Sequence, residues 1–171
     1  MKKILLTLLG VVCIGNILGQ DYPRNIFGVH AGLNVAKIAP VEDVSLGFVV
    51  GVTDQILLHW RSPLYFEIGA DLVGYNLADD YDWRKKLCFV LQVPLHISYH
   101  IYLGEHVAVT PFAGVCTEIG VSPAVFIRQF NLGPSAGLGV NFYQMSLTAQ
   151  YGMGTFGQTK HNVMVKLGYN F

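Results

Sequence analysis

The stretch that decides the fold is LCFVLQVPLHISYHIYL, residues 87–103, which contains no Lys, Arg, Asp or Glu. Every second residue from Leu87 to Leu103 is apolar. The polar side chains fall in the other set: Gln92, His96, Ser98 and His100. A period of two is typical of a strand, and a helix would carry Pro94 in its middle at a cost of about 3 kcal/mol. The stretch therefore predicts a strand with one apolar face, which suits either a protein core or lipid.

The composition is more apolar than one small core needs. Of the 171 residues, 52% are hydrophobic and 13% are charged, and the mean hydropathy is +0.43. Soluble domains carry about 25% charged residues. Beyond the N-terminus no stretch offers about 20 uninterrupted apolar residues, so the excess must lie in shorter segments. The sequence has no basic patch, so nucleic acid is not an expected partner.

Residues 1–20, MKKILLTLLGVVCIGNILGQ, have the order of a secretory signal peptide: two lysines, an apolar run and a small residue near the end. We expect cleavage after Gly19 or Gln20, which leaves residues 21–171 as the mature domain. A retained anchor helix is the alternative, but the run is short for a hydrocarbon layer of about 30 Å. Loss of the two lysines leaves a net charge near −2, because 9 basic residues then face 11 acidic ones.

The alternating pattern recurs along the chain and is bounded each time by Gly, Pro, Asn, Asp or charged clusters. Eight segments show it: 26–38, 46–58, 64–77, 87–103, 106–121, 131–142, 145–157 and 161–171. Three prolines fall inside these segments, where each removes a donor of the strand ladder, and we expect local bulges there. They are Pro94, Pro111 and Pro134.

The faces opposite the apolar stripes decide between core and lipid. They are crowded with Gly, Ser, Thr, Asn, Gln and isolated charges, which suits a narrow polar interior better than a solvated exterior. Each segment reaches the ~9 to 11 residues that a tilted strand needs to cross a bilayer. An open sheet edge is not tolerated in lipid, so the strands must close. The sequence predicts an all-β, eight-stranded, antiparallel up-and-down transmembrane β-barrel.

The connections predict that both termini lie in the periplasm, because an even number of strands brings them to one end. Short turns are expected at 59–63, 104–105 and around Tyr143, and the longer loops at 39–45, 78–86, 122–130 and 158–160. Aromatic residues should form a girdle at each rim. The inner girdle comprises Phe27, Trp60, Phe66, Phe142, Tyr143, Tyr169 and Phe171. The outer girdle comprises Phe48, Tyr75, Phe89 and Tyr151.

Two cysteines, Cys88 and Cys116, remain after signal cleavage. A disulfide can form in an exported protein. A hairpin around Gly104 and Glu105 would place Cys116 opposite about Gln92 rather than opposite Cys88. We therefore expect two free, buried thiols.

A polar network is predicted inside the barrel, because charges within a membrane must find partners. Its members are Glu67, Asp71, Gln92, His96, His100, Glu118 and Lys166. The interior of an eight-stranded barrel is just wide enough for side chains to fill it, which disfavours a sizeable pore. A proton path or a narrow ion path through the network remains an alternative.

Neither a catalytic centre nor a metal site or cofactor is expected. His96-x-Ser98 resembles part of a motif of the lipid A deacylase family. The likeness ends there, because Tyr99 and His100 follow where that family continues with Asn-Ala. The alternation of the strand also places His96 and Ser98 in the lumen. His96 and His100 lie about 13 Å apart at ~3.3 Å per residue, too far to share an ion unless a cross-strand partner such as His30 completes the site.

Six segments resemble the PorT-like outer-membrane β-barrel family of Bacteroidetes, and together they cover essentially the whole mature chain. They are FGVHAGLNVAKI (27–38), LGFVVGV (46–52), LYFEIGADLVGY (64–75), VPLHISYHI (93–101), VTPFAGVCTEIG (109–120) and VMVKLGYNF (163–171). The resemblance implies a barrel in the cell outer membrane; the family's namesake is associated with secretion and gliding. In the seventh strand the chain carries Thr148 and Gln150 where members often carry an acidic and a basic residue.

The last strand also resembles the signal that the barrel-assembly machinery reads during biogenesis. Its outward edge consists of Val165, Leu167, Tyr169 and Phe171. Such an edge can be templated by strand addition. The alternative is a lipid-facing strand without a signalling role.

The outer loops carry the remaining candidates for interaction. These residues are Tyr81, Trp83, Arg84, Lys85, Lys86, Phe126, Arg128 and Phe130. They could bind lipopolysaccharide phosphates or an unknown protein partner, or act as girdle aromatics and solvated charges. The leading hypothesis is an integral outer-membrane protein with a structural or interaction role. The alternatives are a secretion-accessory or narrow-conductance barrel and a lipid A deacylase-like hydrolase.

Overall fold

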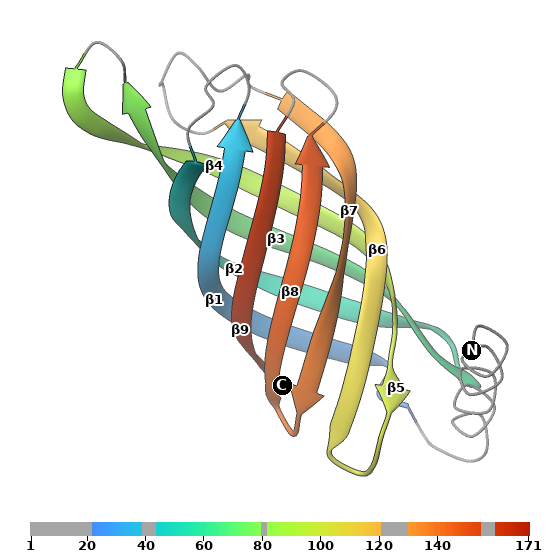
Figure 1. Cartoon of the computed structure of the whole chain (residues 1–171). Helices are drawn as coiled ribbons and strands as arrows, with labels where there is room; N and C mark the ends of the chain where they lie inside the picture. Colours follow the sequence, from blue (N-terminus) through green and yellow to red (C-terminus); the bar gives the residue numbers. More distant parts are fainter. Residues whose placement is uncertain (1–21, 39–43, 80–81, 121–129, 155–159) are drawn as a thin grey trace, which may run out of the picture.

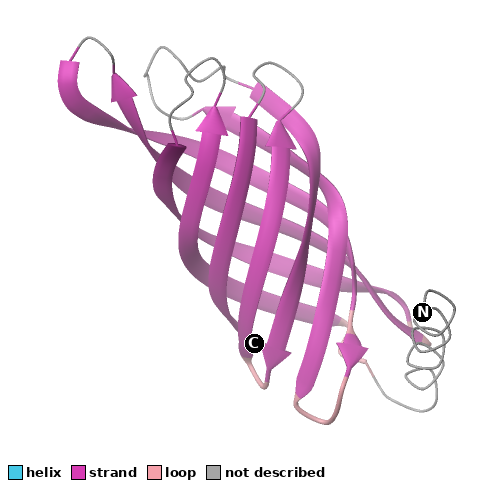
Figure 2. Cartoon of the chain, in the orientation of Figure 1, coloured by secondary structure: helices cyan, strands magenta, loops and turns pink. Residues whose placement is uncertain are grey.

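The computed structural model describes residues 22–38, 44–79, 82–120, 130–154 and 160–171, and of residues 76–88 it describes the backbone alone. Figure 2 shows that the described chain is built of strands and turns. The strands are β1 (Asn25–Ile38), β2 (Val44–His59), β3 (Ser62–Asp79), β4 (Asp82–Tyr99), β5 (Ile101–Tyr102), β6 (Val107–Gly120), β7 (Phe130–Phe142), β8 (Met145–Gly154) and β9 (Lys160–Asn170). Within these ranges no helix is long and apolar enough to cross a membrane.

The strands form one closed antiparallel barrel (Figure 1). Each strand pairs with its neighbours in sequence, and β1 pairs with β9 to join the two ends of the sheet. β4 and β5 both pair with β6, so they are two pieces of one strand and the barrel is eight-stranded. The predicted fold class is confirmed, but the predicted strand 87–103 is divided at His100, although the N–H of His100 still donates to Pro63 O on β3 at 2.9 Å.

The prediction that the three prolines form bulges is wrong. The described ladders shift register within 57–65 and within 77–86, away from these three prolines. The β3–β4 ladder instead has a gap opposite Pro94, the β4–β6 ladder is interrupted opposite Pro111, and the β7–β8 ladder ends one residue before Pro134. Each proline therefore sits where a missing N–H leaves a ladder bond unmade while the register is kept.

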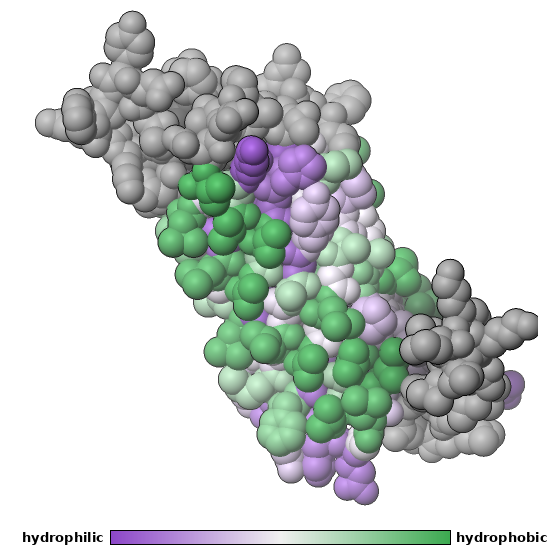
Figure 3. Space-filling model, viewed as in Figure 1, coloured by the Kyte–Doolittle hydropathy of each residue, from purple (hydrophilic) through white to green (hydrophobic). Residues whose placement is uncertain are grey.

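The two faces of the wall have opposite chemistry, as the alternation predicts. Apolar side chains with large exposed fractions occupy the outward positions on every long strand whose side chains are described, among them Leu33 at 62% and Leu167 at 55%. On the face shown in Figure 3, hydrophobic residues cover most of the wall and hydrophilic ones gather near its ends. Buried polar side chains such as Asn34 and Gln150 fill the inside. The molecule therefore has the inverted arrangement of a transmembrane barrel.

Both described chain ends and the short turns lie at the same end of the barrel, as predicted (Figure 1). In the β7–β8 turn Tyr143 adopts φ 54°, the left-handed region that non-glycine residues rarely enter. Its N–H donates to His106 O at 2.8 Å, and its ring stacks on the His106 ring with centroids 4.1 Å apart. Those two contacts hold the turn in place.

Most of the aromatic residues predicted for the two girdles are exposed on the outside of the wall, with one clear exception. Exposed rings at the rims include Trp60, Phe142 and Phe171 at the inner rim and Tyr151 towards the outer one. Tyr75, predicted in the outer girdle, is fully buried in the lumen. It belongs to the inward set of β3 by parity, and its aromatic character was misleading.

The β3–β4 hairpin is longer than predicted. Its strands continue to Asp79 and from Asp82, where the sequence pattern favoured a loop over 78–86. The charged residues of this segment obscure the alternation, but the backbone ladder continues as far as the Asp79–Asp82 pair.

Gly32 lies at the seam that closes the barrel, opposite Lys166 on β9. A Cβ at Gly32 would lie 2.0 Å from Val165 O and 2.8 Å from Lys166 Cα, which are backbone atoms and cannot swing aside. We expect Gly32→Ala to lower the free energy of unfolding of the refolded barrel by about 1–3 kcal/mol, because the seam must open to admit the methyl group. Urea unfolding followed by tryptophan fluorescence measures the change.

The matched control is Gly104→Ala in the turn before β6, because a Cβ there meets nothing within 4 Å. It should leave the unfolding midpoint unchanged. Equal midpoints for the two variants would show that the seam tolerates a side chain at Gly32.

Candidate functional site

The candidate site is the polar interior of the barrel, and all seven residues of the predicted network turn into it. Asp71, Gln92, His96, His100 and Lys166 are buried. Glu67 and Glu118 are partly buried, with 12% of each side chain exposed. The strands bring six of these residues together in three clusters, which sequence reasoning did not separate, whereas the buried Gln92 belongs to none of them.

The first cluster surrounds Asp71 on β3. Lys166 Nζ on β9 donates to Asp71 Oδ2 at 2.6 Å, and His30 Nε2 on β1 lies 2.8 Å from Asp71 Oδ1. Gly51 lies between His30 and Asp71 in the register, and a Cβ there would lie only 2.1 Å from Asp71 Oδ1. The absence of a side chain at Gly51 therefore allows the carboxylate to reach across β2.

The second cluster is a chain of contacts through Glu67 on β3. Gln55 Nε2 donates to Glu67 Oε2 at 2.7 Å, and His96 Nδ1 lies 3.1 Å from Glu67 Oε1. His100 Nε2 lies 3.0 Å from Gln55 Oε1, towards the end of the barrel that carries the short turns. On its other side His96 Nε2 lies 2.6 Å from Ser135 Oγ. The chain thus links β2, β3, β4 and β7 across the lumen.

The third cluster joins Glu118 on β6 to Lys160 on β9. Lys160 Nζ donates to both carboxylate oxygens at 2.9 Å and also to Tyr75 Oη, and it lies 3.9 Å from the centroid of the Tyr75 ring. The sequence pattern placed Lys160 in a loop, whereas β9 begins there. Lys160 shares the parity of Lys166, which was the available signal for its inward direction.

Cys116 is a free and buried thiol, as expected, but its register was predicted wrongly. It lies opposite Pro94 and Gly133, whereas Gln92 lies opposite Glu118. The turn before β6 is longer than the predicted two residues, and this shifts the pairing along the strand.

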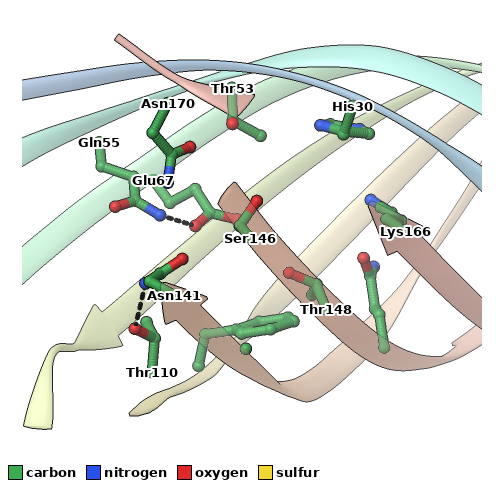
Figure 4. Close-up of a pocket in the computed structure, with 13 residues that line it drawn as sticks. His30, Thr53, Gln55, Glu67, Thr110, Asn141, Ser146, Thr148, Lys166 and Asn170 are labelled. Atoms are coloured by element: carbon green, nitrogen blue, oxygen red, sulfur yellow. Dashed lines mark hydrogen bonds between the residues drawn. The ribbon is translucent and has the colours of Figure 1, made fainter. Parts of the chain in front are cut away.

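The lumen holds small cavities between these clusters. One of about 50 Å³ is lined by polar side chains that include His30, Glu67 and Lys166 (Figure 4). A second of about 10 Å³ borders Cys116 and Lys160. A wider opening of about 300 Å³ lies at the end of the barrel that carries the short turns and includes His100 in its lining. Inside the wall the space therefore suits molecules of the size of water.

The histidines that could suggest a metal site lie in separate places. His30 contacts Asp71, His96 contacts Glu67 and Ser135, and His100 contacts Gln55. Among the residues that the structure describes, no group of three or more His, Cys, Asp or Glu side chains is placed to hold a metal ion.

Other predicted positions are only partly described. Val165, Leu167, Tyr169 and Phe171 all point outward at the end of the chain, as predicted. Phe130 is exposed at the start of β7. The signal peptide 1–20 and the remaining loop candidates lie outside the described residues or side chains, namely Tyr81, Trp83, Arg84, Lys85, Lys86, Phe126 and Arg128.

Comparison of the sequence with protein-family models and with curated proteins finds no match, so the PorT-like resemblance is not confirmed. Solved structures do match. The outer membrane enzyme PagL aligns with a TM-score of 0.61 at 11% identity over 83% of this chain and 98% of that chain. Neisserial surface protein A aligns with a TM-score of 0.56 at 13% identity over 85% and 97%.

The attachment invasion locus protein Ail of Yersinia pestis, in complex with the heparin analogue sucrose octasulfate, aligns with a TM-score of 0.52 at 11% identity over 87% of this chain and 100% of that chain. The likeness to these three proteins is one of fold. The chain has the fold of the small eight-stranded outer-membrane β-barrels, a class in which fold alone does not define activity.

Proposed function

We propose that the chain is an integral outer-membrane β-barrel protein of the PorT-like type, with a structural or interaction role and no catalytic centre. The observation that carries this proposal is the filling of the lumen by paired charges. Asp71 with Lys166 and Glu118 with Lys160 bridge the interior at 2.6 and 2.9 Å. Residues 1–20 are its export signal, and the barrel-assembly machinery recognises the last strand, which ends at Phe171.

Planar-bilayer recording with purified, refolded protein tests this function against a narrow-conductance barrel. We expect no current steps, because an ion would have to displace buried ion pairs to pass. An open porin in the same bilayer serves as the positive control. Reproducible steps from the wild-type protein would contradict the proposal.

A lipid A hydrolase is the rival function, and the likeness in fold to the enzyme PagL is the reason to test it. The candidate His96 and Ser98 are both 1% exposed and face the lumen, away from acyl chains in the surrounding lipid. We expect mass spectrometry of lipid A to give the same acylation pattern with and without the protein. Loss of an acyl chain that depends on the protein would establish the rival.

The interaction role is proposed for the tip of the long β3–β4 hairpin, where β4 begins. Arg84, Lys85 and Lys86 form a basic run beside Trp83, and lipopolysaccharide offers phosphates that such side chains bind. The complex of Ail with a sulfated ligand shows that a barrel of this fold can bind a polyanion. Replacing the three basic residues with glutamine should weaken binding to lipopolysaccharide vesicles but leave binding to neutral phospholipid vesicles unchanged.

A further inference from the structure

Cys116 is surrounded by polar groups that a buried structural thiol does not need. Its Sγ lies 3.8 Å from His96 Nε2 and 3.2 Å from Ser135 Oγ. Gln150 Nε2 donates to the same sulfur at 3.4 Å. The contacts come from β4, β7 and β8, and two of them are made by His96 and Ser135 of the second lumen cluster.

His96 is itself oriented by a carboxylate. Its Nδ1 lies 3.1 Å from Glu67 Oε1, and the other Glu67 oxygen accepts from Gln55 at 2.7 Å. The order nucleophile, imidazole, carboxylate is the arrangement that activates cysteine and serine nucleophiles in proteins. The imidazole can accept the thiol proton at Nε2 while the carboxylate stabilises the resulting imidazolium.

The register explains how this arrangement arises. Glu67 and His96 are directly paired on β3 and β4, and the next two positions across the sheet are Gly114 and Ser135. Gly114 has no side chain, so the imidazole passes over β6 to reach Ser135. Cys116 stands two residues further along β6, beside the same imidazole.

We propose that Cys116 is a covalent modification site for small peroxides, with His96 as the proton acceptor and Glu67 as the residue that positions it. The thiol proton moves to His96 Nε2, and the thiolate sulfur attacks one oxygen of hydrogen peroxide. An S–O bond forms as the O–O bond breaks, and the departing hydroxide takes the proton back as water. The sulfur is oxidised to a sulfenic acid and the peroxide is reduced.

The space around the sulfur selects the reagent. Cys116 is 6% exposed and borders the cavity of about 10 Å³. Such a cavity holds about one water molecule, and hydrogen peroxide is only slightly larger than water. Ser135 lies closer to His96, but a serine hydroxyl reacts with acyl or phosphoryl groups, for which this space is too small. The thiol is therefore the reacting group.

The test compares oxidation of Cys116 in the folded barrel and in the unfolded chain. Full-length protein in detergent micelles receives a pulse of hydrogen peroxide, which catalase ends. The protein is then unfolded in N-ethylmaleimide, and peptide mass spectrometry reports the thiol remaining at Cys116 separately from the other cysteines. We expect oxidation at neutral pH to be about tenfold faster in the folded state, because only a few per cent of an ordinary thiol is ionised there. Slower oxidation in the folded state would overturn the proposal and define an inert buried thiol.

Glu67→Gln identifies the contribution of the imidazole, because it removes the charge that stabilises the imidazolium. It should slow oxidation of the folded protein about tenfold. Glu105→Gln is the matched control, since that side chain is 91% exposed in the turn before β6 and should keep the wild-type rate. Equal rates for the two variants would overturn the assigned role of Glu67. Heat-modified migration on gels verifies that both variants are folded, and the wild-type comparison stands without either variant.

Discussion

Replacing Lys166 with methionine is expected to lower the free energy of unfolding of the refolded barrel by about 3–5 kcal/mol, the largest effect in this series. Asp71 is fully buried, and Lys166 Nζ lies 2.6 Å from its carboxylate. Methionine keeps the length and flexibility of the lysine stem but removes the charge. Among the described side chains, the carboxylate then keeps His30 as its remaining partner. Urea unfolding in lipid vesicles measures the change.

A second substitution separates the lost ion pair from lost packing. Asp71→Asn combined with Lys166→Met removes both charges, and replacing a buried pair with neutral groups is often close to neutral in stability. The double variant should therefore recover most of the stability lost in Lys166→Met. If the double variant is as unstable as the single one, the loss comes from packing around residue 166 and not from a stranded charge.

Leu33→Arg is expected to lower the free energy of unfolding in lipid vesicles by about 2–4 kcal/mol, because it places a charge on the outward face near the middle of β1. Leu33 is 62% exposed in the structure. In a protein whose outer face meets water, arginine would be favourable or neutral at such a position. The sign of the effect therefore reports which solvent surrounds the wall.

The control is Leu103→Arg, the same chemical change at nearly the same exposure, 63%, in the short turn before β6. At the rim the cost of arginine falls to about 0–1 kcal/mol. The difference between the two variants should disappear if both leucines face water, which would contradict a wall embedded in lipid.

The positions where sequence reasoning failed have different local causes. Tyr75 was assigned by its aromatic ring and Lys160 by its place in a polar segment, although the alternation of β3 and β9 turns both inward to the same lumen cluster. The register of Cys116 depended on the length of one turn. The proline bulges were expected from the missing donor alone, whereas the neighbouring strands leave the ladder open and keep the register.

Sequence reasoning also missed which residues contact each other inside the lumen. The alternation of their strands turns His30 and Gln55 inward, but nothing in the chain showed that His30 contacts Asp71 or that Gln55 joins Glu67 to His100. Ser135 lies on the polar face of the predicted strand 131–142, but its contact with His96 depends on a glycine on the strand between them.

The alternation by itself determined the strands, the inward and outward faces and the barrel class, because the period of two is a local property of an extended backbone. Tertiary structure decided which inward groups meet. Lys166 and Asp71 are 95 residues apart in sequence and Cys116 and Ser135 are 19 apart, yet both pairs form across strands. Such contacts depend on the register of every ladder and on the closure of β1 on β9, and a change of one pairing step would turn each side chain to the other face.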